Sequence, residues 1–425
     1  MHPSRHPSES DAFTAALNIS NRRRWGIVGL LFGASMINYV DRATVSMALP
    51  FISADLGLGP AAKGQLLSAF FFSYALMQIP IGWCADRFNL KWLYAGMFLL
   101  WSLAQGLSGF AATLGMLMTF RVILGVGESI YLPGGTKIVS LLFPPAKRGL
   151  PSGLFDFGTR TGLVLDGIVI PWMIVHYGWR RMLVLVGFAA LLWLIPWMLV
   201  FPSNLRAPKR TEGSRPRVSF WQSSWVLMSN RNLIGICLGF FCFDYYWYLL
   251  VNWLPDYLVT VRHLTIMKAG LFASLPFFVF GVSEPLGGWI ADSLTRRGVS
   301  ETLARKGVVT VAFLSGLLLI PAALVENVNA AILLIMAASL VGLATGNLMA
   351  ILQACAPPAE VGLWTGVENF AGNIAGSIAP LTTGFLISWT GSYFPGFALA
   401  AVTLVTGLLA YWFVVGPLPH RDTAE

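Results

Sequence analysis

Two stretches of the sequence place ionisable residues inside long apolar runs. Asp41 and Arg42 lie side by side in a run that begins at Trp25, and Arg121 and Glu128 lie seven residues apart in another. Charged groups cost free energy in apolar surroundings unless they are paired, hydrogen-bonded or wetted. Neighbouring helix positions point about 100° apart, so Asp41 and Arg42 cannot simply neutralise each other. We therefore expect each of them to have its own partner or its own task.

The spacing of Arg121 and Glu128 predicts a site for an organic anion and a proton. Two helical turns separate them, which puts both on one face, about 10.5 Å apart along the axis. That distance is long for a direct salt bridge, so each can hold a separate position in a cavity. A guanidinium group offers paired donors that fit a carboxylate, and burial makes a carboxyl group protonatable near neutral pH. The alternative is an internal ion-pair network that only holds helices together.

The composition predicts that these charges lie in a membrane protein. The chain has 425 residues, of which 56% are hydrophobic and 11% are charged, whereas a soluble protein of this length typically carries about 25% charged residues. Apolar windows of about 20 residues predict an all-α membrane protein with twelve transmembrane helices. The expected spans are 25–49, 64–84, 92–112, 116–140, 150–175, 182–201, 233–258, 268–291, 307–325, 330–352, 361–387 and 394–416.

Basic residues outside the spans are distributed unevenly between the two sides of the membrane. Nineteen of the 28 fall on the side of the N-terminus and five on the other side. This bias predicts that both termini are cytoplasmic, in the cell inner (plasma) membrane. The net charge of +9 therefore sets orientation in the lipid bilayer and indicates no nucleic-acid partner. The remaining basic residues, Arg42, Arg121, Lys137 and Arg160, lie inside spans.

The chain reads as two halves. A basic, proline-containing segment over 202–232 separates two sets of six expected spans, and GWCADR at 82–87 is echoed 206 positions later by GWIADS. Duplicated six-span halves are typical of secondary transporters. The predicted organisation is a cytoplasmic tail (1–24), a six-helix bundle (25–201), a cytoplasmic linker (202–232), a second six-helix bundle (233–416) and a cytoplasmic tail (417–425).

Charged residues inside the spans avoid every third span. Spans three, six, nine and twelve carry none in their interiors, which is expected if these spans face lipid and the others surround a wet cavity. The charged positions are Asp41, Arg42, Arg121, Glu128, Lys137, Asp156, Arg160, Asp166, Asp244, Glu284 and Glu368.

Several motifs in order resemble the major facilitator superfamily. GWCADRFNLK and GWIADSLTRRG look like its signature after the second span and the degenerate copy after the eighth. RVILGVGESIYLPGGTKIVSLLFPPAKRG at 121–149, INYVDR at 37–42 and GVENFAGNIAGSIAPLTTG at 366–384 are similar to its anion:cation symporters, which include bacterial sugar-acid transporters, vesicular glutamate transporters and sialin.

The resemblance implies roles for particular residues. Asp41 and Glu128 would couple the proton, and Arg42 and Arg121 would attract the substrate carboxylate. Asp86, Arg87 and Asp292 of the two signature loops would take part in gating. The other residues that the resemblance points to for substrate binding are Tyr39, Tyr74, Thr159, Arg160, Trp364, Asn369 and Asn373.

The fifth span departs from the family pattern. Thr159 stands where sugar-acid members commonly have a Gln, which puts the usual hydroxyl recognition in doubt. Asp156 and Arg160 are four residues apart, and we favour an intrahelical ion pair between them. The alternative is a third guanidinium in the cavity, which would suit a dicarboxylate. Asp166 has no expected partner, and Asp244, Glu284 and Glu368 have no assigned role.

These features predict a secondary active transporter that carries an organic anion together with protons by alternating access. We expect a sugar acid such as a hexonate, hexuronate or aldarate. An anion exchanger or facilitator for aromatic acids, dicarboxylic acids or organic phosphates is the alternative. The sequence has no HExxH, GxSxG or P-loop motif, and its five histidines lie in loops or tails, so we expect no enzyme, metal or cofactor. The resemblance implies a monomer.

Overall fold

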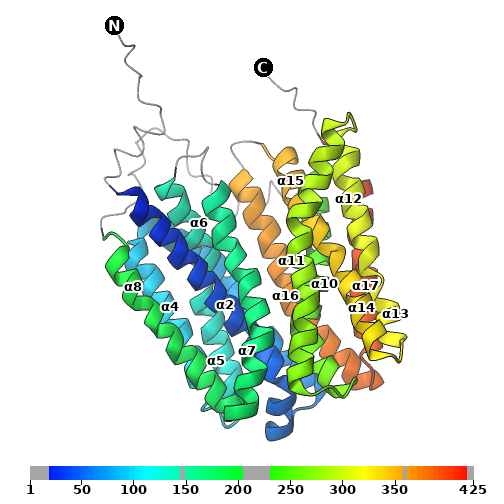
Figure 1. Cartoon of the computed structure of the whole chain (residues 1–425). Helices are drawn as coiled ribbons and strands as arrows, with labels where there is room; N and C mark the ends of the chain where they lie inside the picture. Colours follow the sequence, from blue (N-terminus) through cyan, green and yellow to red (C-terminus); the bar gives the residue numbers. More distant parts are fainter. Residues whose placement is uncertain (1–18, 144–148, 204–229, 358–360, 419–425) are drawn as a thin grey trace.

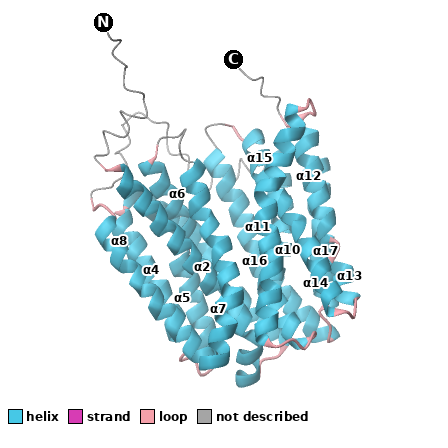
Figure 2. Cartoon of the chain, viewed as in Figure 1, coloured by secondary structure: helices cyan, strands magenta, loops and turns pink. Residues whose placement is uncertain are grey.

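The computed structural model describes residues 19–143, 149–203, 230–357 and 361–418. Every regular element in these ranges is helical, and short loops join the helices (Figure 2). The predicted tails and the linker over 202–232 lie largely outside the described residues. The structure therefore confirms the all-helical prediction for the part of the chain that it describes.

The helices follow the apolar runs of the sequence. The first half forms α2 (Asn21–Leu56), α3 (Pro60–Arg87), α4 (Leu90–Ser108), α5 (Leu114–Glu128), α6 (Tyr131–Leu142), α7 (Gly149–Ala190), η2 (Leu191–Trp193) and α8 (Leu194–Val200). The second half forms α10 (Arg231–Thr260), α11 (Ile266–Arg296), α12 (Glu301–Gly316), α13 (Leu319–Leu324), α14 (Val328–Ala338), η3 (Ser339–Ala344), α15 (Thr345–Cys355), α16 (Val361–Thr390), α17 (Phe394–Leu409) and η4 (Ala410–Val414).

Polar side chains at the starts of the long helices explain where many of them begin. A hydroxyl or amide oxygen at the N-cap accepts a hydrogen bond from a backbone N–H that the helix itself cannot pair. Within the apolar runs, the backbone satisfies its own polar groups, as a segment in a bilayer must. The residues that cap a helix in this way are Ser20, Asn89, Thr113, Asn230, Thr265, Ser300 and Asn327.

Eight helical stretches in the described residues are long and apolar enough to cross a membrane. One of them, Pro151–Val200, has 50 residues. Gly178 interrupts its helical geometry with a φ of 76°, between the expected fifth and sixth spans. The first three expected spans are helical as α2, α3 and α4, but they are not among the eight. The twelve-span count therefore stays a prediction.

The helices of the two halves of the chain form two adjoining groups. In Figure 1 the helices up to α8 occupy one side and those from α10 onwards occupy the other, with the first and last described residues at the same end, called the terminal end below. The groups meet where α3 packs along α16, α7 packs along α11 and α2 contacts α10.

Close backbone approaches join the two groups in the half of the molecule away from the terminal end. A Cβ at Gly64, near the start of α3, would lie 2.7 Å from the carbonyl oxygen of Pro380 and 3.2 Å from the Cα of Gly384 on α16. Ser68, one turn further along α3, donates a hydrogen bond of 2.6 Å to the carbonyl oxygen of Ser377. The α3–α16 contact therefore depends on a residue without a side chain at Gly64.

We predict that Gly64→Ala weakens this contact. The added methyl group has no room, so overpacking should lower the free energy of unfolding by about 1–3 kcal/mol. Gly96→Ala is the matched control, because nothing lies within 4 Å of a Cβ at that helical position and alanine favours a helix over glycine. Thermal unfolding of both purified variants checks this. Equal midpoints would contradict a tight α3–α16 contact.

Candidate functional site

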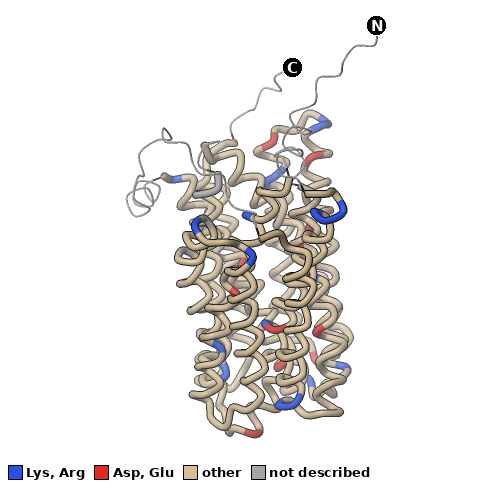
Figure 3. Tube along the Cα trace, turned by 90° about the vertical axis from the view of Figure 1, so that its left-hand side faces the viewer, with Lys and Arg blue, Asp and Glu red and all other residues tan. Residues whose placement is uncertain are grey.

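A buried ion pair between α2 and α5 forms the centre of the candidate site. The Arg42 Nε atom lies 2.9 Å from Glu128 Oε2, and the two side chains are 4% and 0% exposed. Most other charged residues lie near helix ends, as Figure 3 shows, and a smaller number lie inside the helical bundle. Removing two charges from water is costly, so a pair this deeply buried is held by close geometry and by its surroundings.

Aromatic rings surround the Arg42 guanidinium. Its Cζ atom lies 4.9 Å from the ring centroid of Tyr39, 5.1 Å from that of Phe70 and 4.3 Å from that of Tyr74. The negative face of an aromatic ring attracts a cation, and the attraction grows when the cation is desolvated. These rings stabilise the charge of Arg42 without using its N–H donors. Its Nη2 atom has no hydrogen-bond partner in the described residues.

Arg121 of α5 is a second buried guanidinium, and it is unpaired. The side chain is 0% exposed, and none of its three side-chain nitrogens has a hydrogen-bond partner in the described part of the chain. Its Cζ atom lies 4.8 Å from the ring centroid of Phe70, the ring that Arg42 also contacts. Buried donors are nearly always satisfied in proteins. A fork of free donors beside a second guanidinium suits a carboxylate.

Unpaired acceptors accompany these donors. Both carboxylate oxygens of Asp41 and the second carboxylate oxygen of Glu128 are buried without a close hydrogen-bond partner among the described residues. Asp41 interacts electrostatically with Glu128 and with Arg121. The structure thus brings Asp41, Arg42, Arg121 and Glu128 into one cluster. Asn38 interacts with Glu128 and belongs to the same cluster, although no pattern in the sequence pointed to it.

Two glycines let α5 carry this cluster into the core. A Cβ at Gly127 would lie 2.7 Å from the Cβ and 2.8 Å from the backbone nitrogen of Trp101 on α4, and one at Gly125 would overlap Ser73 of α3. The close approach holds Glu128, the last residue of α5, against its neighbours. Arg121 lies two turns earlier on the same helix. As the spacing predicted, the two side chains occupy separate positions, since Glu128 pairs with Arg42 instead.

The prediction of an ion pair between Asp156 and Arg160 is wrong. Arg160 of α7 pairs with Glu284 of α11, and its Nε atom lies 3.3 Å from Glu284 Oε2. Asp156 instead accepts a hydrogen bond of 3.3 Å from the Tyr131 hydroxyl. Spacing along one helix cannot reveal a partner on another helix, and a carboxylate on α11 offers Arg160 the better geometry.

Another expected substrate residue, Thr159, is 1% exposed. Asp166, for which the sequence suggested no partner, accepts a hydrogen bond of 3.3 Å from the Thr44 hydroxyl. Thr159 and Asp166, which precede and follow Arg160 in the sequence of α7, are therefore both buried. Arg160 itself is only half-buried.

The expected residues of α16 lie in the second group of helices. Trp364 is 1% exposed and its indole N–H has no partner in the described residues. Asn373 donates a hydrogen bond of 2.7 Å to the side-chain oxygen of Asn369, which leaves its own side-chain oxygen unpaired. One turn later, Gly376 packs against Phe71 of α3 and Tyr248 of α10. This contact brings α16 toward the helix that carries Phe70 and Tyr74.

The predicted gating residues lie away from the buried cluster, at the ends of α3 and α11 that are nearer the terminal end. The Arg87 guanidinium lies 3.9 Å from the ring centroid of Trp83. Asp292 pairs with Arg305 of α12 at 3.3 Å. The side chain of Asp86 lies outside the described part of the structure. These positions leave their gating role a prediction.

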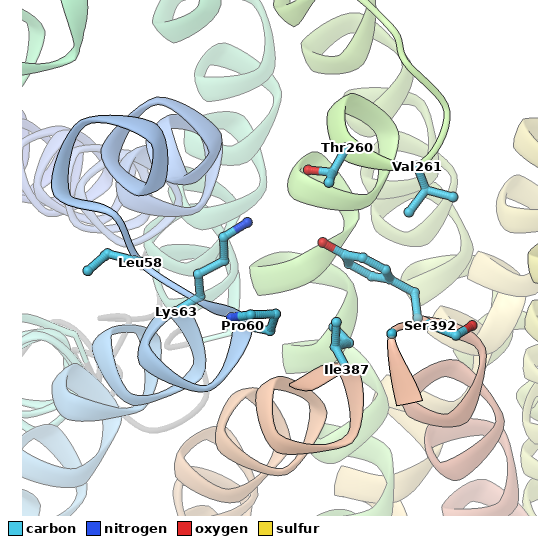
Figure 4. Close-up of a pocket in the computed structure, with 9 residues that line it drawn as sticks. Leu58, Pro60, Lys63, Thr260, Val261, Ile387 and Ser392 are labelled. Atoms are coloured by element: carbon cyan, nitrogen blue, oxygen red, sulfur yellow. The ribbon is translucent and has the colours of Figure 1, made fainter. Parts of the chain in front are cut away.

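The sequence analysis missed an ion pair at the other end of the molecule. Lys63 of α3 lies 2.9 Å from an oxygen of Asp256 on α10, whose carboxylate is fully buried and also accepts a hydrogen bond from Tyr393. Figure 4 shows Lys63 extending from the α3 side toward the helix that carries Thr260. A surface pocket of about 410 Å³ lies here, lined by Leu58, Pro60, Lys63, Thr260, Val261, Ile387, Gly391, Ser392 and Tyr393. The pair joins the two groups of helices at this end.

Comparison with known proteins identifies the family. The sequence profile of the Major Facilitator Superfamily matches residues 31–300. The chain belongs to this superfamily. Major facilitator proteins are membrane transporters, so the chain is a transporter and not an enzyme, and the resemblance seen in the sequence is confirmed.

Relatives within the superfamily align along almost the whole chain. A "probable galactarate/D-glucarate transporter" of Bacillus subtilis is 31% identical over 93% of this chain and 92% of the relative. A "D-galactonate transporter" of Escherichia coli is 30% identical over 93% of this chain and 96% of the relative.

Solved structures share the major facilitator fold. The crystal structure of a bacterial homolog of the human lysosomal transporter Spinster superposes with a TM-score of 0.79 at 20% identity, over 95% of this chain and 100% of that chain. A D-xylose-proton symporter gives a TM-score of 0.69 at 15% identity, over 92% and 98%. At these identities the likeness concerns the fold alone.

We predict that Lys63→Met destabilises the protein mainly by leaving the Asp256 carboxylate buried without its cation. Breaking a buried pair from one side typically costs about 3–5 kcal/mol, whereas replacing both partners costs much less. The double variant Lys63→Met, Asp256→Asn should therefore recover at least half of the loss in thermal stability.

Thermal unfolding of the single and double variants measures this coupling. Lys268→Met is the control, because Lys268 is an exposed lysine at the start of α11. A double variant as unstable as Lys63→Met alone would mean that lost packing, rather than the unpaired carboxylate, causes the effect.

Proposed function

We propose that this transporter carries a sugar acid together with a proton across the cell inner membrane by alternating access. The observation that carries the proposal is the Arg121 guanidinium, which is fully buried and unpaired in the described residues beside the Arg42–Glu128 ion pair. A substrate carboxylate is the acceptor that fits this arrangement. The relatives named for galactarate, glucarate and galactonate support the sugar-acid class.

The Arg42–Glu128 pair supplies a physical route to coupling. A proton on Glu128 removes the charge that holds Arg42, which frees the guanidinium to bind a carboxylate together with Arg121. Loss of that proton restores the competing carboxylate and favours release of the substrate. Because the two binding events are linked, each strengthens the other by the same factor. Asp41, which interacts with both Glu128 and Arg121, is the second proposed proton site.

Neutral polar groups beside Arg42 and on α16 suit a polyhydroxy acid. The rings of Tyr39 and Tyr74 contact the Arg42 guanidinium. On α16, the indole N–H of Trp364 and the side-chain oxygen of Asn373 are buried and unpaired in the described residues. Amide, phenol and indole groups can donate to or accept from sugar hydroxyls. We assign Thr159 and Asn369 to the same substrate contacts.

We further propose twelve membrane crossings arranged as two six-helix halves. The stretch Pro151–Val200 has 50 residues, about 75 Å of helix, which is enough to cross a hydrocarbon layer of about 30 Å twice. Counting it twice and adding α2, α3 and α4 to the other seven apolar stretches gives twelve. The break in helical geometry at Gly178 supports the double crossing.

The positive-inside bias supports two cytoplasmic termini. The end that carries the Lys63–Asp256 pair then faces outward. The helix ends that carry Asp86, Arg87 and Asp292 face the cytoplasm, where we assign these residues to gating. We propose that the protein works as a monomer in the lipid bilayer and uses the proton as its coupling ion, with no cofactor.

Reconstituted protein gives the test of coupling. In proteoliposomes, an inward proton gradient should drive accumulation of the sugar acid by the wild type. Glu128→Gln mimics the protonated carboxyl, so the variant should keep substrate exchange across the membrane but lose gradient-driven accumulation. Radiolabelled galactarate or D-galactonate reports both activities.

Glu326→Gln is the matched control, since Glu326 is an exposed loop residue, and it should behave as the wild type does. Gradient-driven accumulation by Glu128→Gln would show that Glu128 is not the coupling site. A wild type that exchanges substrate but ignores the proton gradient would instead favour the exchanger.

We also predict that Arg121→Lys weakens sugar-acid binding about tenfold or more. The lysine keeps the positive charge but loses the planar fork, and a charged hydrogen bond is worth about 1.5–3 kcal/mol. Isothermal titration of purified protein measures the change. Arg181→Lys, at an exposed position of α7, is the control. Unchanged affinity in Arg121→Lys would refute two-point binding by this residue.

A further inference from the structure

A second Arg–Glu pair lies between the two groups of helices. Arg160 of α7 and Glu284 of α11 are 18% and 17% exposed, whereas Arg42 and Glu128 are 4% and 0% exposed. An ion pair that holds two helices together and is partly accessible can exchange one partner for a charged ligand more easily than a sealed pair.

Aromatic rings support Arg160 as they support Arg42. Its Cζ atom lies 5.0 Å from the ring centroid of Trp247 on α10 and 5.3 Å from that of Phe280 on α11. The rings contact the guanidinium through their faces, so its N–H donors remain for a carboxylate. In this structure that carboxylate belongs to Glu284.

Tyr39 links the two Arg–Glu pairs. Its ring lies 4.9 Å from the Cζ atom of Arg42, and the residue interacts electrostatically with both Arg42 and Arg160. One tyrosine therefore interacts with a guanidinium that is paired with Glu128 and with another that is paired with Glu284. Arg42 and Arg160 thus both lie close enough to Tyr39 for one ligand to be considered for both.

We propose that Arg160 is the binding group for a second carboxylate, so that the site prefers dicarboxylic sugar acids over monocarboxylic ones. This inference rests on the proposed sugar-acid transport. One carboxylate of the substrate binds Arg42 and Arg121, and the other replaces Glu284 on Arg160. A monocarboxylic acid leaves the Arg160–Glu284 pair intact.

Charge balance then predicts the number of protons that accompany each substrate. Replacing Glu284 by a substrate carboxylate adds a negative charge, which a proton on Glu284 cancels. The groups that face Glu284 are Arg160 and Asp156 of α7, and Asp244 of α10 interacts with Arg160. The neighbouring helices α14, η3 and α15 carry no charged side chain. A dicarboxylate should therefore carry one more proton than a monocarboxylate.

Galactarate and D-galactonate form a matched pair of probes, because they differ mainly in the second carboxylate. In purified full-length protein, Arg160→Gln should weaken galactarate binding about tenfold or more and change D-galactonate binding by less than about threefold. Arg181→Gln, an exposed position of α7 beyond the break at Gly178, is the control and should change neither. Equal effects on both acids, or no effect on either, would overturn the proposal.

Glu284→Gln provides a second readout that does not depend on the folding of Arg160→Gln. This variant should bind galactarate at least as tightly as the wild type and carry one proton fewer with each galactarate. A pH-sensitive dye in proteoliposomes measures the ratio, and an unchanged ratio would overturn the proposal.

The two proposals fail in different ways. A wild type that binds D-galactonate but not galactarate would refute the second carboxylate site and leave sugar-acid transport standing. A wild type that binds neither acid would refute the proposed function itself.

Discussion

The contact on which the account depends is the buried ion pair between Arg42 and Glu128, next to a guanidinium with no partner in the described residues. The pair is 2.9 Å long, and Glu128 and Arg121 are both fully buried. Arg42, Arg121, Asp41 and Glu128 carry equal numbers of positive and negative charges when all are ionised. A proton or a carboxylate that enters alone disturbs this balance, whereas the two together preserve it. The cotransport that we propose follows from that constraint.

The scaffold holds these groups by close helix packing. Gly125 and Gly127 let α5 approach α3 and α4, and Gly64 lets α3 approach α16 across the boundary between the two groups of helices. Lys63 and Asp256 add an ion pair at the end opposite the terminal end. Contacts of this kind can be made and broken as units, which is what movement of one rigid half against the other requires. Arg160 and Glu284 lie on the same boundary.

The sequence predicted the class of protein and the central cluster because membranes tolerate few buried charges. The charged groups of Asp41, Arg42, Arg121 and Glu128 therefore had to be paired or functional. Their spacing along the helices excluded simple pairs between Asp41 and Arg42 or between Arg121 and Glu128. The long-range pairs could not be predicted. Arg160 and Glu284 are 124 residues apart and Lys63 and Asp256 are 193 apart, and periodicity along one helix carries no information about such contacts. The expectation that opposite charges four residues apart on a helix pair with each other therefore assigned Arg160 the wrong partner, Asp156. The break in helical geometry at Gly178, in contrast, lies between the fifth and sixth spans that the sequence predicted, because hydropathy does locate the ends of apolar runs.

Infrared difference spectroscopy of the purified protein tests the central claim most directly, because it detects the protonation of individual carboxyl groups. Addition of the sugar acid to the wild type should produce the band of a protonated carboxyl group, and this band should be missing in Glu128→Gln. A substrate that binds the wild type without producing a band that depends on Glu128 would contradict the account, because the anion would then enter while the Arg42–Glu128 pair stays ionised.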